Sequence, residues 1–177
     1  MADGPTAIDL VIRAATPEDA EALHRAIAGL GAFVGASHRI ECTADDLRRY
    51  GFGPDAAFDA LIAEVGGAFA GMCIYFKSFS TWLGRPGVYV QDLFVEERFR
   101  GAKVGESLLR RVAAATQAQG GVYLRLSVEV GNESAQAFYE RIGISRSDKE
   151  FIHAAYGGNF LSLGEPGQMN LPGEEQS

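Results

Sequence analysis

The residues with the clearest chemical potential form a short basic turn near the middle of the chain, Arg100-Gly101-Ala102-Lys103-Val104-Gly105. The turn follows a predicted strand and opens a predicted helix, whose first N–H groups have no partner within the helix and carry partial positive charge. Its two glycines allow a ligand to approach the backbone closely, and its two basic side chains add charge. The pattern predicts a diphosphate site at the helix N-terminus. The alternative is an ordinary strand-to-helix turn with solvated basic side chains.

A second candidate group is the phenol of Tyr139, which lies in the segment Asn132-Glu133-Ser134-Ala135-Gln136-Ala137-Phe138-Tyr139. Apolar residues at helical spacing, continuing to Ile142, predict a short helix here. A phenol has a pKa of about 10 and can donate a proton to a leaving group held against it. Tyr139 is therefore a candidate general acid, and the alternative is an aromatic residue on the apolar stripe of the helix.

Runs of apolar residues predict the strands that position these groups, at residues 8–13, 58–65, 69–79, 88–95 and 122–128. Gly66-Gly67 joins the second and third strands as a hairpin. A helix from Val104 to about Gln119 connects the fourth and fifth strands, which must therefore be parallel. The sequence predicts an α/β fold with a mixed, mostly antiparallel sheet of six or seven strands and flanking helices.

The two ends of the chain add helices and a tail to this prediction. Thr16 and Thr43 each precede acidic residues at capping spacing and predict helix starts. Residues 152–156 and 160–163 are predicted to pair as a last hairpin. From Gly164 onward Gly, Pro, Glu and Gln dominate. We therefore expect one domain over residues 1–163 and a flexible tail over residues 164–177.

Composition narrows the possible partners. A chain of 177 residues with 47% apolar and 22% charged residues is typical of one globular domain. The net charge of −7 argues against a nucleic-acid partner, and the two cysteines do not suggest a disulfide framework. No apolar stretch approaches the ~20 residues that span a bilayer, and residues 1–7 do not read as a leader, so we expect a cytoplasmic protein without a membrane partner. No cluster of residues suggests a metal or a covalent nucleophile.

Taken together, the two chemical segments resemble the signatures of GNAT-type N-acetyltransferases. The family's loop reads Arg/Gln-x-x-Gly-x-Gly/Ala, which this chain matches at Arg100 and Gly105, with Lys103 in place of the first glycine. A lysine adopts positive φ only at a cost in free energy, so the loop either avoids that conformation or carries strain. The family's second signature is matched at every fixed position by Asn132-x-x-Ala135-x-x-Phe138-Tyr139-x-x-x-Gly143.

Further stretches between residues 8 and 145 resemble the diamine (spermidine/spermine) and thialysine acetyltransferase branch. They are Phe52-Gly53, Ala63-Glu64-Val65, Tyr75-Phe76, Trp82-Leu83-Gly84-Arg85 and Asp92-Leu93-Phe94-Val95. The resemblance implies the GNAT fold with a splayed parallel strand pair. It also implies acetyl-CoA as co-substrate, direct transfer to an amine in a ternary complex, and a homodimer.

The resemblance also assigns roles to residues. Tyr139 becomes the acid that protonates the CoA thiolate, and the N–H groups of Leu93 and Phe94 become donors to the developing oxyanion. The implied cofactor-binding residues are Leu93, Phe94, Val95, Arg100, Gly101, Ala102, Lys103, Val104, Gly105, Asn132 and Tyr139. The candidate acceptor-binding residues are Glu64, Tyr75, Trp82, Gln91 and Asp92. For Glu64 and Tyr75, the alternative is an exposed strand carboxylate and a strand aromatic.

The acceptor half departs from the polyamine enzymes. Gln91 stands where they have a glutamate, and an amide cannot accept the amine's proton. Strand alternation places Asp92 on the opposite face, Ser80 replaces an aspartate, and Ser37-His38-Arg39 replaces an acidic cluster. We therefore expect an acetyl-CoA-dependent N-acetyltransferase whose acceptor is a small primary amine, either a diamine or a lysine-like amino acid. The alternatives are a non-catalytic acyl-CoA-binding module and a protein lysine or N-terminal acetyltransferase.

Overall fold

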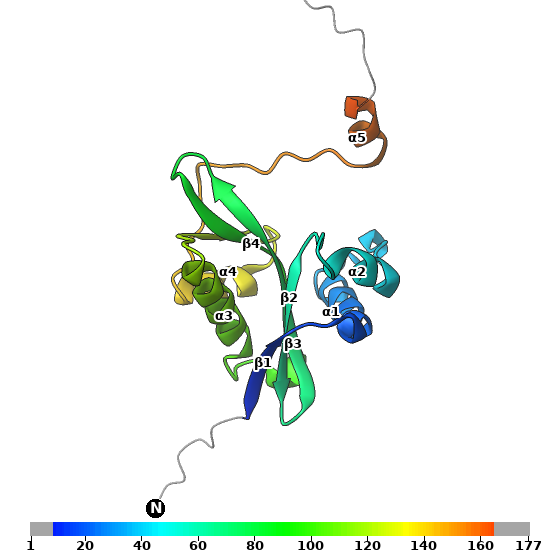
Figure 1. Cartoon of the computed structure of the whole chain (residues 1–177), viewed down its shortest axis with the longest axis vertical. Coiled ribbons are helices and arrows are strands. Elements are labelled where there is room, and N and C mark those ends of the chain that lie inside the picture. Colours follow the sequence, from blue (N-terminus) through cyan, green and yellow to red (C-terminus); the bar gives the residue numbers. More distant parts are fainter. Residues whose placement is uncertain (1–8, 165–177) are drawn as a thin grey trace, which may run out of the picture. The chain divides into compact units, whose positions relative to one another are not determined.

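The computed structural model of the chain describes residues 9–164. These residues fall into two compact units that divide after Gly143. The first unit contains a central sheet and the helices that cover it, and the second contains a single short helix within its described residues (Figure 1).

A five-stranded sheet forms the centre of the first unit. Its strands lie side by side in chain order: β1 (Leu10–Ala14), β2 (Asp59–Val65), β3 (Ala68–Ser80), β4 (Arg85–Val95) and β5 (Leu124–Leu126). The first four strands are antiparallel to their neighbours. β5 is parallel to β4, as the crossover through α3 (Val104–Ala118) requires. Gly66 and Gly67, with φ of 58° and 76°, form the tight turn between β2 and β3.

A group of helices and short turns covers one face of this sheet (Figure 1). They are η1 (Pro17–Asp19), α1 (Ala20–Phe33), η2 (Ser37–Arg39) and α2 (Ala44–Gly51). The hydroxyl of Thr43 accepts a hydrogen bond from the Asp46 N–H at 3.2 Å, and the Asp46 carboxylate accepts one from the Thr43 N–H at 2.9 Å. This reciprocal pair satisfies N–H groups at the start of α2, as the sequence predicts.

The opposite face carries α3 and α4 (Glu133–Arg141), with the short turn η3 (Glu97–Phe99) leading from β4 toward α3. α3 is amphipathic, and its apolar stripe of Val104, Leu108, Leu109 and Val112 is buried. The apolar stripe of α3 therefore packs on the sheet, and the first turn of α3 lies beside the end of β4.

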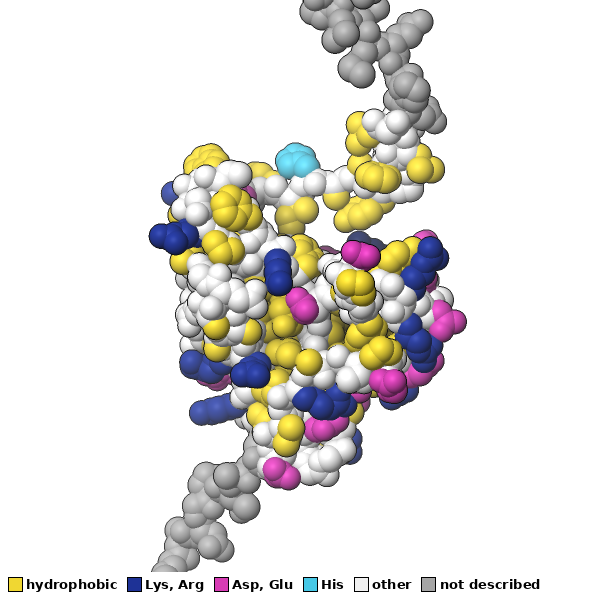
Figure 2. Space-filling view, viewed as in Figure 1, with side chains coloured by type: hydrophobic (Ala, Val, Ile, Leu, Met, Phe, Trp, Pro, Cys, Tyr) yellow, Lys and Arg dark blue, Asp and Glu magenta, His cyan; other side chains and the backbone are white. Residues whose placement is uncertain are grey.

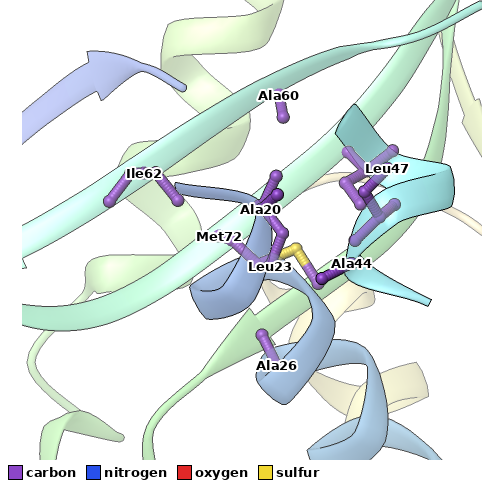
Figure 3. Packing of buried hydrophobic residues seen from close by; sticks show 9 residues of the cluster. Ala20, Leu23, Ala26, Ala44, Leu47, Ala60, Ile62 and Met72 are labelled. Carbon is purple, nitrogen blue, oxygen red and sulfur yellow. The ribbon is translucent and has the colours of Figure 1, made fainter. Parts of the chain in front are cut away.

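A core cluster lies between the sheet and the helices α1 and α2 (Figure 3). Leu23 of α1 and Leu47 of α2 meet Ile62 of β2 and Met72 of β3, and all four are almost fully buried. Burying each such side chain contributes about 1.5–3 kcal/mol. The cluster fixes the position of α1 on the sheet.

Two sequence predictions of the fold are wrong. The sheet has five strands among the described residues rather than six or seven, and the hairpin expected at 152–156 and 160–163 is absent there. Residues 151–156 have no regular structure, and α5 (Gly157–Gly164) is a helix. Short apolar runs do not distinguish strand from helix, and these have no strand to pair with. Of the predicted tail, Gly164 ends α5 and residues 165–177 lie outside the described part.

The surface of the first unit is mixed in character. Figure 2 shows hydrophobic side chains gathered over the sheet between the two helical layers, with basic and acidic side chains around them. Within residues 9–164, no helix combines the length and the apolar character needed to cross a membrane.

Candidate active site

The edge of the sheet between β4 and β5 is open over half of its length. The two strands pair only where Val88–Val90 meets Leu124–Leu126. Beyond Val90, β4 continues to Val95 with β3 on one side and no described strand on the other. A strand edge of this kind presents N–H and C=O groups that are free to bind a ligand.

A β-bulge at Gln91 determines which residues of β4 face this open edge. Ile74 pairs with Asp92 and Tyr75 with Val90, which leaves Gln91 as an extra residue. Before the bulge, the Val88 N–H donates to Tyr123 on the β5 side at 3.1 Å. After it, the Glu96 N–H donates to Ala70 on the β3 side at 2.9 Å.

Strand alternation then places the backbone groups of Leu93 and Val95 at the open edge. The carbonyl oxygen of Phe94 instead lies against Gly71 of β3, where a Cβ atom would collide with it. The side chain of Phe94 packs on α1 and that of Leu93 lies toward α3, near Gly105. The two residues predicted as oxyanion donors therefore face different neighbours.

A cavity of about 480 Å³ lies beside the open edge. Its walls include ten of the eleven residues predicted for cofactor binding: Leu93, Phe94, Val95, Arg100, Gly101, Lys103, Val104, Gly105, Asn132 and Tyr139. Ala102 is half-buried and does not line it. The two signature segments, more than two dozen residues apart in the sequence, thus meet at one cavity.

The first turn of α3 opens into this cavity. Gly105 is buried, and a Cβ atom there would lie 3.3 Å from Val95 and 3.5 Å from Phe138, so its absence lets α3 approach β4 closely. Lys103, the N-cap of α3, has φ of 61°, and it is the one non-glycine residue with positive φ among residues 9–164. The loop therefore keeps the left-handed conformation usual for glycine and carries the strain of a lysine side chain.

Tyr139 reaches the cavity from α4. Asn132 caps this helix, because its side-chain oxygen accepts a hydrogen bond from the Ala135 N–H at 3.1 Å. Tyr139 is half-buried, and burial raises the pKa of its phenol to about 12, with a smaller contribution from Cys73. Burial likewise raises the pKa of the Cys73 thiol to about 12. Tyr139 is therefore protonated at every physiological pH.

The predicted acceptor residues are dispersed, and none of them lines the cavity. The Glu64 carboxylate accepts a hydrogen bond from Arg13 at 2.8 Å, and Trp82, at the β3–β4 turn, is 98% exposed. Gln91 is exposed. Asp92 and Tyr75 are half-buried, and burial raises the pKa of both groups.

Sequence reasoning missed part of the cavity wall, namely Leu30, Phe33, Phe99, Glu106, Ser134, Ala135, Phe138 and Arg141. Ala135 and Phe138 belong to the quoted signature, so the motif itself was a usable signal for them. Leu30 and Phe33 lie on the apolar stripe of α1, and periodicity cannot distinguish a cavity wall from a core contact. Among the described residues, no cluster of His, Cys, Asp and Glu is arranged to hold a metal.

Comparisons with known proteins agree with this geometry. The chain is 31% identical to thialysine N-epsilon-acetyltransferase of Mus musculus over 140 residues, which are 75% of this chain and 82% of that protein. It is 30% identical over 153 residues to spermidine/spermine N(1)-acetyltransferase-like protein 1 of Homo sapiens, covering 80% of this chain and 21% of that protein.

Among solved structures, an integron cassette protein from the mobile metagenome of V. cholerae shares the fold. It has a TM-score of 0.74 at 20% identity, covering 89% of this chain and 98% of that one. Residues 31–144 match the family model described as the acetyltransferase (GNAT) family. The chain therefore belongs to the GNAT family and is an acetyl-CoA-dependent N-acetyltransferase.

Proposed function

We propose that this chain acetylates a small primary amine, a lysine-like amino acid or a short diamine, by direct attack in a ternary complex. The observation that carries this proposal is the convergence of three features on one cavity: the open edge of β4, the N-terminus of α3 and the phenol of Tyr139. Each has a separate task in acetyl transfer, and no covalent intermediate on the protein is needed.

The residues at the N-terminus of α3 fit the diphosphate of CoA. Arg100 and Lys103 line the cavity, and the close packing at Gly105 brings the first turn of α3 to its wall. Glu106 also lines the cavity, but its carboxylate accepts a hydrogen bond from Arg110 at 2.7 Å. This ion pair offsets the repulsion that Glu106 would exert on an anionic ligand.

The backbone of β4 fits the thioester end. The thioester of acetyl-CoA supplies an activated acyl group, and its carbonyl oxygen gains negative charge as an amine attacks. We assign the N–H of Leu93 as the donor to this oxygen, because the bulge at Gln91 turns Leu93 to the open edge. Val95, which faces the same edge, is assigned to the pantetheine arm.

Tyr139 is assigned as the proton donor to the leaving thiolate. A phenol with a pKa of about 12 is a poor acid toward a thiol in water, whose pKa is about 8.5. The neighbouring Cys73 indicates how burial changes this balance, since its own thiol pKa is also about 12. A thiolate formed in the same apolar surroundings is destabilised in the same way. Burial of the thiolate therefore makes proton transfer from Tyr139 less unfavourable than it would be in water.

Asp92 is assigned to the acceptor ammonium. Its carboxyl group is half-buried, and among the described residues no basic side chain forms an ion pair with it. On its face of β4 it lies opposite Ile74, next to the core under α1 and α2. Burial raises the pKa of Asp92, and a cationic amine nearby would stabilise its ionised form.

The charge around η2 supports a small acceptor. Arg39 in this turn pairs with Glu129 at 3.4 Å, so the segment offers a neutralised ion pair where the polyamine enzymes have acids. Each charge-assisted contact to a substrate is worth about 1.5–3 kcal/mol. Losing two or three of them should weaken binding of a tri- or tetracation by orders of magnitude. The mouse relative named for thialysine agrees with a lysine-like acceptor.

The test is an acceptor panel followed by release of free CoA thiol. We expect kcat/KM for thialysine, lysine or a short diamine to exceed that for spermidine and spermine by at least about tenfold, from the loss of one charge contact or more. A higher kcat/KM for spermine than for every smaller amine would refute the proposed acceptor class. Failure of every amine with an enzyme that binds CoA would point to a macromolecular acceptor instead.

We also propose that the chain forms a homodimer. The β3–β4 hairpin carries Phe79, Trp82 and Leu83, which are 62%, 98% and 58% exposed. Contiguous exposed apolar side chains of this kind favour association. Light scattering after size exclusion should give twice the chain mass, and Trp82→Asp should reduce it. A monomeric wild type at high micromolar concentration would contradict the dimer.

A further inference from the structure

No sequence motif assigns the C-terminal end of α1 to the cofactor site, yet this end forms one wall of the cavity. Leu30 and Phe33 line it together with the loop that opens α3. A Cβ atom at Gly29 would lie 2.8 Å from the ring of Phe94, so the glycine lets α1 lie directly against β4. Phe33 follows Gly29 by one helical turn and therefore projects on the same side of α1.

The ring of Phe33 contacts the guanidinium group of Arg100. The guanidinium carbon lies 4.8 Å from the ring centroid, and the Nε atom donates a hydrogen bond to the Val95 carbonyl at 3.4 Å. A cation within about 6 Å of a ring face is attracted to it. Arg100 is an exposed side chain with several rotatable bonds. These two contacts restrict it to the mouth of the cavity before any ligand arrives.

We infer that Phe33 is a positioning residue for the cofactor, which holds the Arg100 guanidinium where it meets the CoA diphosphate. The inference rests on the proposed cofactor site and adds to it a residue on a different element. Phe33 is 52% exposed, so its ring is accessible beside the cavity that it lines. Preorganising Arg100 lowers the entropy lost when the diphosphate binds.

The same structure offers a matched control. Tyr50 on α2 is 49% exposed, and the guanidinium of Arg49 lies 5.1 Å from its ring centroid. Neither residue lines the cavity. Removing the Tyr50 ring therefore breaks an exposed arginine–aromatic contact of the same type at a place where the inference predicts no effect on CoA.

The experiment measures the Kd of CoA by calorimetry for Phe33→Leu, Phe33→Trp and Tyr50→Ala. Phe33→Leu keeps apolar bulk but removes the ring face, and we expect CoA to bind about three- to tenfold more weakly. Phe33→Trp, with a better ring face, and Tyr50→Ala should both bind CoA within twofold of wild type. The melting temperature of each variant without ligand reports whether it folds.

Two further readouts separate positioning from simple wall contact. In an Arg100→Gln background, Phe33→Leu should weaken CoA by less than twofold, because the ring acts through Arg100. The KM for acetyl-pantetheine, a thioester without the diphosphate, should not change in Phe33→Leu, and kcat at saturating acetyl-CoA should stay near the wild-type value.

The results have distinct meanings. If wild type does not bind CoA, the proposed cofactor site itself fails. If wild type binds CoA and Phe33→Leu binds it equally well, the inference about Phe33 is overturned while the site stands. An equal loss in the Arg100→Gln background, or an equal loss of affinity for acetyl-pantetheine, would also overturn it, since either result assigns Phe33 to the cavity wall alone.

Discussion

The proposed cofactor side and the proposed acceptor side of this molecule are built in different ways. Most of the cofactor side comes from one continuous stretch of β4, η3 and α3 together with α4, and the end of α1 completes the wall of a single cavity. The candidate acceptor residues come from three strands and the tip of a hairpin, and they have separate surroundings. Residues close together in the sequence form most of the first side, whereas the candidates for the second side lie apart on separate elements.

The two sides also differ in what a departure from the family's sequence pattern changes, as Lys103 and Gln91 illustrate. Lys103 stands where the family's loop has a glycine, and it nevertheless has the left-handed conformation. Replacing a carboxylate by Gln91 leaves the strand in place but removes a proton acceptor. At Lys103 the local backbone conformation is kept despite the altered side chain, while at Gln91 the altered side chain removes the proposed base.

The largest effect should come from Tyr139, the proposed acid on the wall of the cavity. Tyr139→Phe removes the proposed proton donor, so kcat should fall by about 10²-fold or more while the KM for acetyl-CoA changes little. Steady-state kinetics at saturating acceptor measures both constants. A kcat within twofold of wild type would show that Tyr139 is not the acid that protonates the leaving thiolate.

A charge reversal on the cofactor side should rank second. Arg100→Glu replaces an attractive contact to the diphosphate by a repulsive one, and we expect CoA to bind about 30- to 100-fold more weakly. Titration calorimetry gives the affinity, and higher salt should narrow the gap between variant and wild type. Equal binding by the two proteins would place the diphosphate elsewhere.

On the acceptor side, Gln91→Glu should alter the pH dependence. Without a strong local base, the wild-type rate should climb with pH toward the acceptor's own pKa, near 10.4 for a lysine-like amine. Tyr139, with a pKa of about 12, remains protonated over this range and should cause no decline. A glutamate at position 91 is ionised above about pH 5, so it should raise kcat/KM near pH 7 by up to about tenfold and flatten the alkaline rise. An unchanged profile would argue against position 91 as a base site.

Lys103→Gly should have opposite effects on stability and on binding. Relief of the left-handed strain outweighs the added freedom of the unfolded glycine, for a net gain of about 0.5–1 kcal/mol in the free energy of unfolding. The loss of one cation should weaken CoA about three- to tenfold. Thermal unfolding and calorimetry measure the two. A variant that binds CoA more tightly would show that Lys103 hinders the ligand.

The smallest effect should follow Glu64→Gln. Glu64 pairs with Arg13, which also binds Asp19 at 2.7 Å, and the partly exposed pair with Glu64 is worth about 0.5 kcal/mol after screening. We expect a slight loss of stability with no change in acceptor KM. A raised acceptor KM would return Glu64 to the acceptor groove and weaken the contrast between the two sides.

The sequence predicts which residues of β4, α3 and α4 line the cavity, because the signals for them are local. The Gly-bearing loop, the cap at Asn132 and the phenol at Tyr139 each follow from residues close together in the chain. It does not predict the contribution of α1, because Phe33 reaches the cavity only through packing of Gly29 on β4. The expected last hairpin fails for a related reason: whether residues 152–163 pair depends on a partner strand that the sequence does not reveal.

The bulge at Gln91 makes the site depend on the number of residues in β4 as well as on their identity. In a strand without it, the backbone of Phe94 would face the open edge, and the amide of Leu93 would turn toward β3. Deleting the extra residue of the bulge would thus turn the N–H of Phe94, in place of that of Leu93, toward the open edge where we propose that the acyl oxygen binds. The number of residues between Tyr75 and Leu93 therefore decides which backbone groups of β4 face the open edge, whatever side chain stands at position 91.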